Sequence, residues 1–135
     1  MTKPPVDPSR LRQRLGESIA RWAQLIRSIQ GERGPLVRGV YVEAGRRCGK
    51  PSCRCTRGEL HGTAMISAKI GGRTRNTYVP LEDREQVQQA ALRYRRLRRA
   101  RAEIAKLTRE TLALIDALER ALTRPYPPDD KETKR

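Results

Sequence analysis

Residues 63–80 read TAMISAKIGGRTRNTYVP, and this stretch predicts a β-hairpin. Residues 63–70 alternate between apolar and other side chains, as a strand with one buried face does. Gly71 and Gly72 both accept the positive φ angles of a two-residue hairpin turn, and residues 73–79 form the returning strand. Both faces carry polar residues, so the pattern does not indicate which face is buried. The predicted register pairs Ile66 with Thr77 and Met65 with Tyr78.

The segments on either side of the hairpin add another strand and a long helix. Residues 36–43 (LVRGVYVE) are rich in Val and Tyr and predict a strand, so residues 36–80 hold a three-stranded antiparallel sheet. A helix is predicted over 81–122, because acidic residues follow Pro80 and favour a helix N-terminus. This helix is too long to bury its apolar stripe alone. Its second half is expected to pair with an N-terminal helix as a helical hairpin, or with a second subunit as a coiled coil.

The N-terminal segment predicts the other helix. Asp7 is a helix cap before Pro8, and apolar residues recur every three or four positions over 8–30. The chain is therefore an α+β protein: N-terminal helix, three-stranded antiparallel sheet with a Cys/His loop, and long C-terminal helix. We expect one domain over 8–124, with disordered ends at 1–7 and 125–135.

All three cysteines and the only histidine lie within 14 residues, in the string CGKPSCRCTRGELH. Three thiolates and one imidazole are the ligand set of tetrahedral structural zinc. The expected ligands of one zinc ion per chain are Cys48, Cys53, Cys55 and His61. The spacing differs from the usual Cys-x2-Cys pairs, so two alternatives stay open. These are a redox switch built on low-pKa thiols, and a turn-rich loop that binds no metal.

The chain carries a large positive charge, which indicates a polyanionic partner. Its 30 Lys and Arg residues outnumber 15 acids and give a net charge of +15. Arginine predominates, and guanidinium groups suit phosphates and base edges, so nucleic acid is favoured over acidic membranes or proteins. Basic residues gather in the Cys loop, at the hairpin tip and in the run RYRRLRRAR. The expected nucleic-acid contacts are Arg46, Arg47, Lys50, Arg54, Arg57, Lys69, Arg73, Arg75, Asn76, Arg93, Arg95, Arg96, Arg98 and Arg99.

Several classes of protein are disfavoured by what the sequence lacks. It has no run of 18 apolar residues and no apolar core of a secretory signal, so neither a membrane partner nor secretion is expected. A cytoplasmic, nucleoid-associated location with reduced thiols follows. There is no P-loop, dinucleotide fingerprint or HExxH helix, so neither an enzyme nor a small-molecule substrate is expected.

The Cys/His string also resembles a family of small uncharacterised bacterial and archaeal proteins. Those proteins share a CGKP-x-C-x-C segment and Gly-x-x-His-Gly, present here as Cys48 to Cys55 and as Gly58 to Gly62. The resemblance covers about 36–122 and includes the glycine turn and Tyr78-Val79-Pro80. It implies no established activity. Family members often have an aromatic-rich strand after His-Gly, where this chain has Thr63-Ala64-Met65-Ile66.

These observations favour a zinc-stabilised nucleic-acid-binding protein, with DNA preferred. The hairpin loosely resembles the three-stranded DNA-binding arms of tyrosine recombinases, which suggests an accessory or regulatory factor of mobile DNA. An RNA-binding or ribosome-associated protein is an alternative that composition does not separate from the first. A helical protein-interaction module is another, and a homodimer through the helices is compatible with each.

Overall fold

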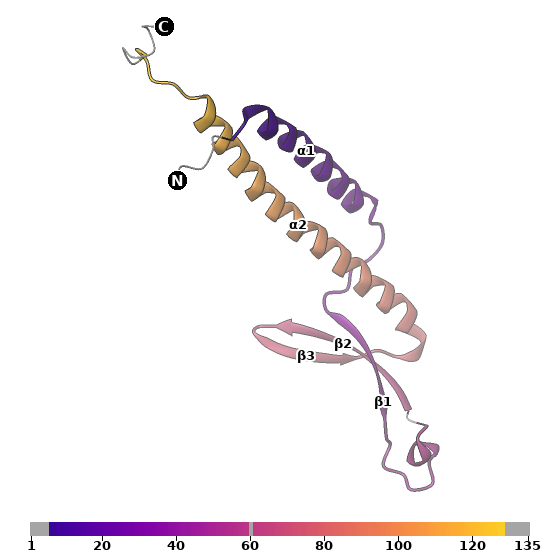
Figure 1. Cartoon of the computed structure of the whole chain (residues 1–135). Coiled ribbons are helices and arrows are strands. Elements are labelled where there is room, and N and C mark those ends of the chain that lie inside the picture. Colours follow the sequence, from indigo (N-terminus) through magenta and orange to yellow (C-terminus); the bar gives the residue numbers. More distant parts are fainter. Residues whose placement is uncertain (1–5, 60, 129–135) are drawn as a thin grey trace. The chain divides into compact units, whose positions relative to one another are not determined.

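The computed structural model describes residues 6–59 and 61–128, and it confirms the α+β architecture (Figure 1). The chain forms two compact units. The helical unit comprises Met1–Gln30 and Ala100–Arg135, and the sheet unit comprises Gly31–Arg99. In chain order the elements are α1 (Pro8–Gly31), β1 (Val40–Arg46), a 3-10 turn (Arg54–Arg57), β2 (His61–Ile70), β3 (Arg73–Tyr78), a second 3-10 turn (Leu81–Asp83) and α2 (Arg84–Leu122).

The sheet unit is a meander in which β2 lies between β1 and β3. The predicted register is confirmed, since Ile66 pairs with Thr77 and Met65 with Tyr78. Gly71 and Gly72 have φ angles of +60° and +81°, as the predicted turn requires. The buried face of β2 is the one that carries Ala64 and Ile66. Their side chains form the core with Val79 and with Ala91 of α2, and the partly buried Val37, Tyr41 and Val87 pack around it.

The first strand begins and ends later than the predicted 36–43. Residues before Val40 form a linker, because the N–H of Val37 donates to the carbonyl of Ala90 on α2, at 3.1 Å, instead of to a strand. Beyond Glu43 the strand continues to Arg46, whose partner is His61. The two strands that flank the Cys loop are therefore paired with each other along the whole of β1. The predicted long helix also begins at Arg84, after the 3-10 turn, instead of at residue 81.

In the helical unit α1 lies beside the second half of α2 (Figure 1). This is the predicted helical hairpin, one of the two arrangements that the sequence left open. Leu11, Leu25 and Leu114 are buried, and Arg21 forms an ion pair with Glu103. The predicted Asp7 cap is confirmed, since its Oδ1 accepts the backbone N–H of Ser9 at 3.0 Å. Of the ends expected to be disordered, residues 1–5 and 129–135 lie outside the described residues. No helix in the described part of the chain is both long and apolar enough to cross a membrane.

Candidate metal centre and basic surfaces

The Cys loop closes the hairpin of β1 and β2, so both of its ends are fixed by the sheet. The last of the four predicted metal ligands, His61, is the first residue of β2 and pairs with Arg46 at the end of β1. Within the loop the N–H of Cys53 donates to the carbonyl of Lys50, at 3.2 Å, and the 3-10 turn follows at once. Gly58 ends that turn at φ +102°, a left-handed conformation that glycine adopts without steric cost. The loop thereby turns back toward His61.

The four predicted ligands lie together at the end of this hairpin. The three sulfur atoms and a ring nitrogen of His61 all lie within 4.8 Å of one another. The Sγ atoms of Cys48 and Cys55 are 3.5 Å apart, and Cys53 Sγ is 3.0 Å from His61 Nε2. In tetrahedral zinc, bonds of about 2.3 Å to sulfur and about 2.0 Å to nitrogen place ligand atoms roughly 3.5–3.8 Å apart. The cluster therefore has the dimensions to hold one metal ion.

The thiols differ in how readily they ionise. A hydrogen bond from the backbone N–H of Lys50 lowers the pKa of Cys48, and the thiols of Cys53 and Cys55 lower it further. The backbone N–H of Cys48 donates to Cys55 Sγ at 3.4 Å and favours the thiolate there. Burial and the two neighbouring thiols outweigh that hydrogen bond and raise the pKa of Cys55. Its side chain is fully buried. A divalent cation would relieve the repulsion between neighbouring thiolates, so this group of residues is suited to a metal.

Arg84 links the end of the Cys loop to α2, and no sequence pattern singles this residue out. Its Nη2 donates to the carbonyl of Gly62 at 3.0 Å. Gly62 follows His61 directly, so the first residue of α2 holds the start of β2 in place. The Nε atom of Arg84 is buried without a hydrogen-bond partner among the described residues. This contact joins residues 22 positions apart, and only the folded chain brings them together.

The predicted nucleic-acid contacts fall into three groups within the sheet unit. The basic residues of the Cys loop and those of the β2–β3 hairpin lie at opposite ends of β2 (Figure 1). Ten residues of strand separate these ends by about 30 Å. The third group lies on α2. Of the fourteen predicted residues, all are exposed except Arg93, which is half-buried with its guanidinium against Gly34.

One arginine of α2 is engaged in an ion pair that the sequence did not predict. Arg96 Nε donates to Glu32 at 2.7 Å, across 64 residues of chain. The hydrogen bond from Arg96 lowers the pKa of Glu32, and the charge of Arg93 adds to the effect. The partner of Arg96 lies far away in the sequence, where no local pattern indicates it. Within the described residues of the sheet unit, Arg96 is the only cation with a carboxylate within 4.0 Å.

Fold and site together define a small α+β protein with a β-hairpin loop that could hold one metal ion. The chain belongs to a family described as a domain of unknown function, DUF6788, whose model matches residues 7–89. The match includes α1, the sheet and the Cys loop, and it ends early in α2. It is consistent with the expected resemblance to an uncharacterised family, although it begins and ends earlier than the expected 36–122. No curated protein and no solved structure matches the chain.

Proposed function

We propose that this protein is a nucleic-acid-binding protein whose binding surface is held in shape by one zinc ion, with DNA as the preferred ligand. The observation that carries the proposal is the distribution of charge. The sheet unit contains sixteen basic and six acidic residues, a net charge of +10, so about half of the chain carries two thirds of its charge. Apart from Arg96, its cations have no ion-pair partner among the described residues. Free guanidinium groups at this density are suited to bind phosphates.

Zinc is proposed because the ligand set is closed. Three thiolates and one imidazole from the protein fill a tetrahedral site, which is the composition of structural zinc and leaves no position for a substrate. For this reason we assign the ion a structural role and propose no catalytic activity. Native mass spectrometry with elemental analysis tests this assignment directly. We expect one zinc per chain, lost in Cys53→Ser, whereas a metal-free wild-type protein would favour a redox switch or a turn-rich loop that binds no metal.

Duplex binding is tested by its dependence on salt. Neutralising one phosphate changes the slope of log K against log salt by about 0.9, so binding should weaken steeply as salt rises. Changing both Arg54 and Arg57 to Gln should remove two phosphate contacts and so make this slope shallower by about 1.8. The matched control changes Arg10 and Arg12, two exposed arginines of α1, to Gln and alters the net charge equally. Equal effects of the two double variants would show that only total charge matters.

RNA remains the alternative ligand, since both polymers present the same phosphates. A competition experiment between duplex DNA and structured RNA at one salt concentration decides between them. Preference for RNA would point to ribosome association, and preference for DNA to the nucleoid and to the accessory role in mobile DNA. A response to salt that is flat for both polymers would contradict nucleic-acid binding altogether.

A homodimer through the helical unit is proposed from its exposed apolar side chains. Ile19 is 69% exposed, Trp22 47% and Leu112 55%, and the three line one hollow of about 220 Å³ between α1 and α2. A second copy of the same face would cover this surface in an isologous interface. Sedimentation should show a dimer for the wild type and for Ile70→Glu, an exposed control position in β2, and a monomer for Ile19→Glu. A monomeric wild type would contradict the homodimer and favour the alternative of a helical interaction module, in which this face binds a different protein.

A further inference from the structure

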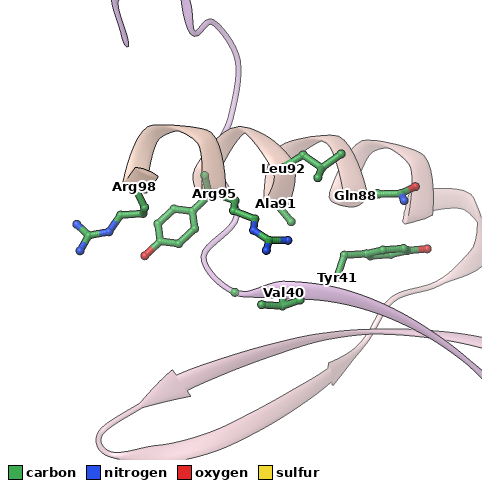
Figure 2. Close-up of a pocket in the computed structure, with 9 residues that line it drawn as sticks. Val40, Tyr41, Gln88, Ala91, Leu92, Arg95 and Arg98 are labelled. Atoms are coloured by element: carbon green, nitrogen blue, oxygen red, sulfur yellow. The ribbon is translucent and has the colours of Figure 1, made fainter. Parts of the chain in front are cut away.

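A groove runs between α2 and the start of β1 in the sheet unit (Figure 2). Its volume is about 350 Å³, and Ala91, Leu92 and Tyr41 are among the residues that line it. A second hollow of about 300 Å³ lies where β1 begins, beside Lys69 and Thr74. Gly39, Val40 and Tyr94 line both hollows, so the two hollows are neighbours.

The groove combines aromatic rings with unpaired cations. Tyr94 is half-buried and contributes to both hollows, and Tyr41 lines the first, with its hydroxyl donating to Glu43 at 2.6 Å. Arg95 and Arg98 of α2 line the first hollow, and in Figure 2 the side chain of Arg95 extends from the helix toward Val40. Arg38 and Lys69 line the second. None of these four cations has an ion-pair partner within the described part of the chain.

The walls of the groove are fixed by the backbone. The linker before β1 is bonded to α2 through Val37 and Ala90, as described above. At Gly39 the chain passes so close to β2 that an added Cβ would lie 2.7 Å from the carbonyl oxygen of Ser67, and φ is +123°. Only glycine fits this close approach. The groove is thus a preformed feature of the sheet unit and does not depend on the conformation of a long loop.

We infer that this groove binds unpaired nucleotides of a nucleic-acid strand, with a base against Tyr94 and the flanking phosphates on Arg95, Arg98, Arg38 and Lys69. The inference rests on the proposed function and specifies the feature of the nucleic acid that this site recognises. A cationic groove with aromatic side chains is the usual arrangement for single strands, because every base offers a face for stacking. The volume lies at the lower end of the range for small-ligand sites, which suits one or two nucleotides. A duplex hides its base faces and would contact only the rim.

The test compares a blunt DNA duplex with the same duplex carrying a short single-stranded extension, by fluorescence anisotropy at one salt concentration. Wild-type protein should bind the extended duplex more tightly. Tyr94→Ala should reduce affinity for the extended duplex about 5- to 150-fold, with little change for the blunt one. Tyr94→Phe keeps the ring and should retain the preference. Tyr78→Ala removes an exposed tyrosine of β3 outside the groove and serves as the matched control.

A second measurement on the wild type keeps the test independent of variant folding. A 2-aminopurine base in the extension loses fluorescence when it stacks on an aromatic ring, so binding should quench it. Equal affinity for both duplexes, or emission that does not change on binding, would overturn the inference while leaving duplex binding intact. No binding of either duplex would instead contradict the proposed function. Repeating the comparison with an RNA extension shows which polymer supplies the unpaired nucleotides.

Discussion

Replacing Cys55 by serine is expected to unfold the sheet unit while the helical unit stays folded. Cys55 is the fully buried member of the candidate metal centre, and its Sγ contacts both the backbone and the sulfur of Cys48. Serine removes one of four ligands and leaves a hydroxyl in its place. Loss of the proposed ion would also remove the positive charge that holds the remaining thiolates of Cys48 and Cys53 together.

The expected size of the effect follows from how little else holds the sheet. The buried cluster contains four side chains, and only Ile66 and Val79 are larger than alanine. Full burial of such a side chain contributes about 1.5–3 kcal/mol. A structural zinc ion contributes on the order of 10 kcal/mol, which matches the whole stability of a typical small domain. Removing the metal should therefore leave no measurable stability in the sheet unit.

The two units can be followed separately in one sample. Trp22 is the only tryptophan and lies in α1, so its fluorescence reports on the helical unit. Amide spectra by NMR report on β1 to β3. On adding a chelator to the wild type, or in Cys55→Ser, the dispersed strand signals should collapse while the emission of Trp22 changes little.

The control variant lies in the same loop but outside the ligand set. Thr56→Ala removes an exposed hydroxyl that donates to the carbonyl of Cys53 at 2.7 Å, and it should cost only about 0.5–1.5 kcal/mol. Strand signals that persist after elemental analysis has confirmed complete removal of metal would refute the argument. In that case the apolar core alone would be sufficient to hold the sheet.

The remaining predictions concern three contacts of the sheet unit. Because the hydrogen bond from Arg96 lowers the pKa of Glu32, this pair stabilises the fold above the ordinary pKa of the carboxyl group and less as pH falls through the lowered value. Urea unfolding of Glu32→Gln across acidic pH should therefore show a weaker pH dependence than the wild type, and identical profiles would contradict it. Gly39→Ala should lower the urea midpoint more than Gly72→Ala, since both have positive φ but only Gly39 has atoms within 4 Å of an added Cβ. Arg84→Ala should weaken metal binding in a chelator competition without changing the stoichiometry of one ion per chain, and unchanged affinity would show that the contact with Gly62 does not position His61.

Much of the fold could be predicted because its signals are local. The glycine pair at 71–72 fixed the hairpin and its register, and the clustering of three cysteines with His61 identified the candidate metal ligands. The start of β1 was predicted too early because residues 36–39 have strand-like composition. Their conformation is instead set by the bond from Val37 to α2 and by the close approach at Gly39, both of which are tertiary contacts.

The binding surfaces were less predictable because they too depend on tertiary contacts. Exposure of the basic residues could be expected from composition, whereas the ion pair of Glu32 with Arg96 and the anchor at Arg84 join distant parts of the sequence. The sequence has only one Trp, four Tyr and no Phe, and so few aromatic residues do not by themselves indicate single-strand binding. The fold nevertheless brings two of the four tyrosines, Tyr41 and Tyr94, to one groove, and this placement is what favours stacking of a base.

The position of the Cys loop at the closed end of the β1–β2 hairpin has a consequence for the order of folding. Its ligands span only 14 residues, so gathering them costs little chain entropy compared with contacts between distant segments. The core, in contrast, needs Ala91 and Val87 from α2, which follow later in the chain. During synthesis the complete ligand set emerges before either of these residues does. Capture of the proposed metal ion can thus precede core formation and serve as the nucleus on which β1 and β2 first align.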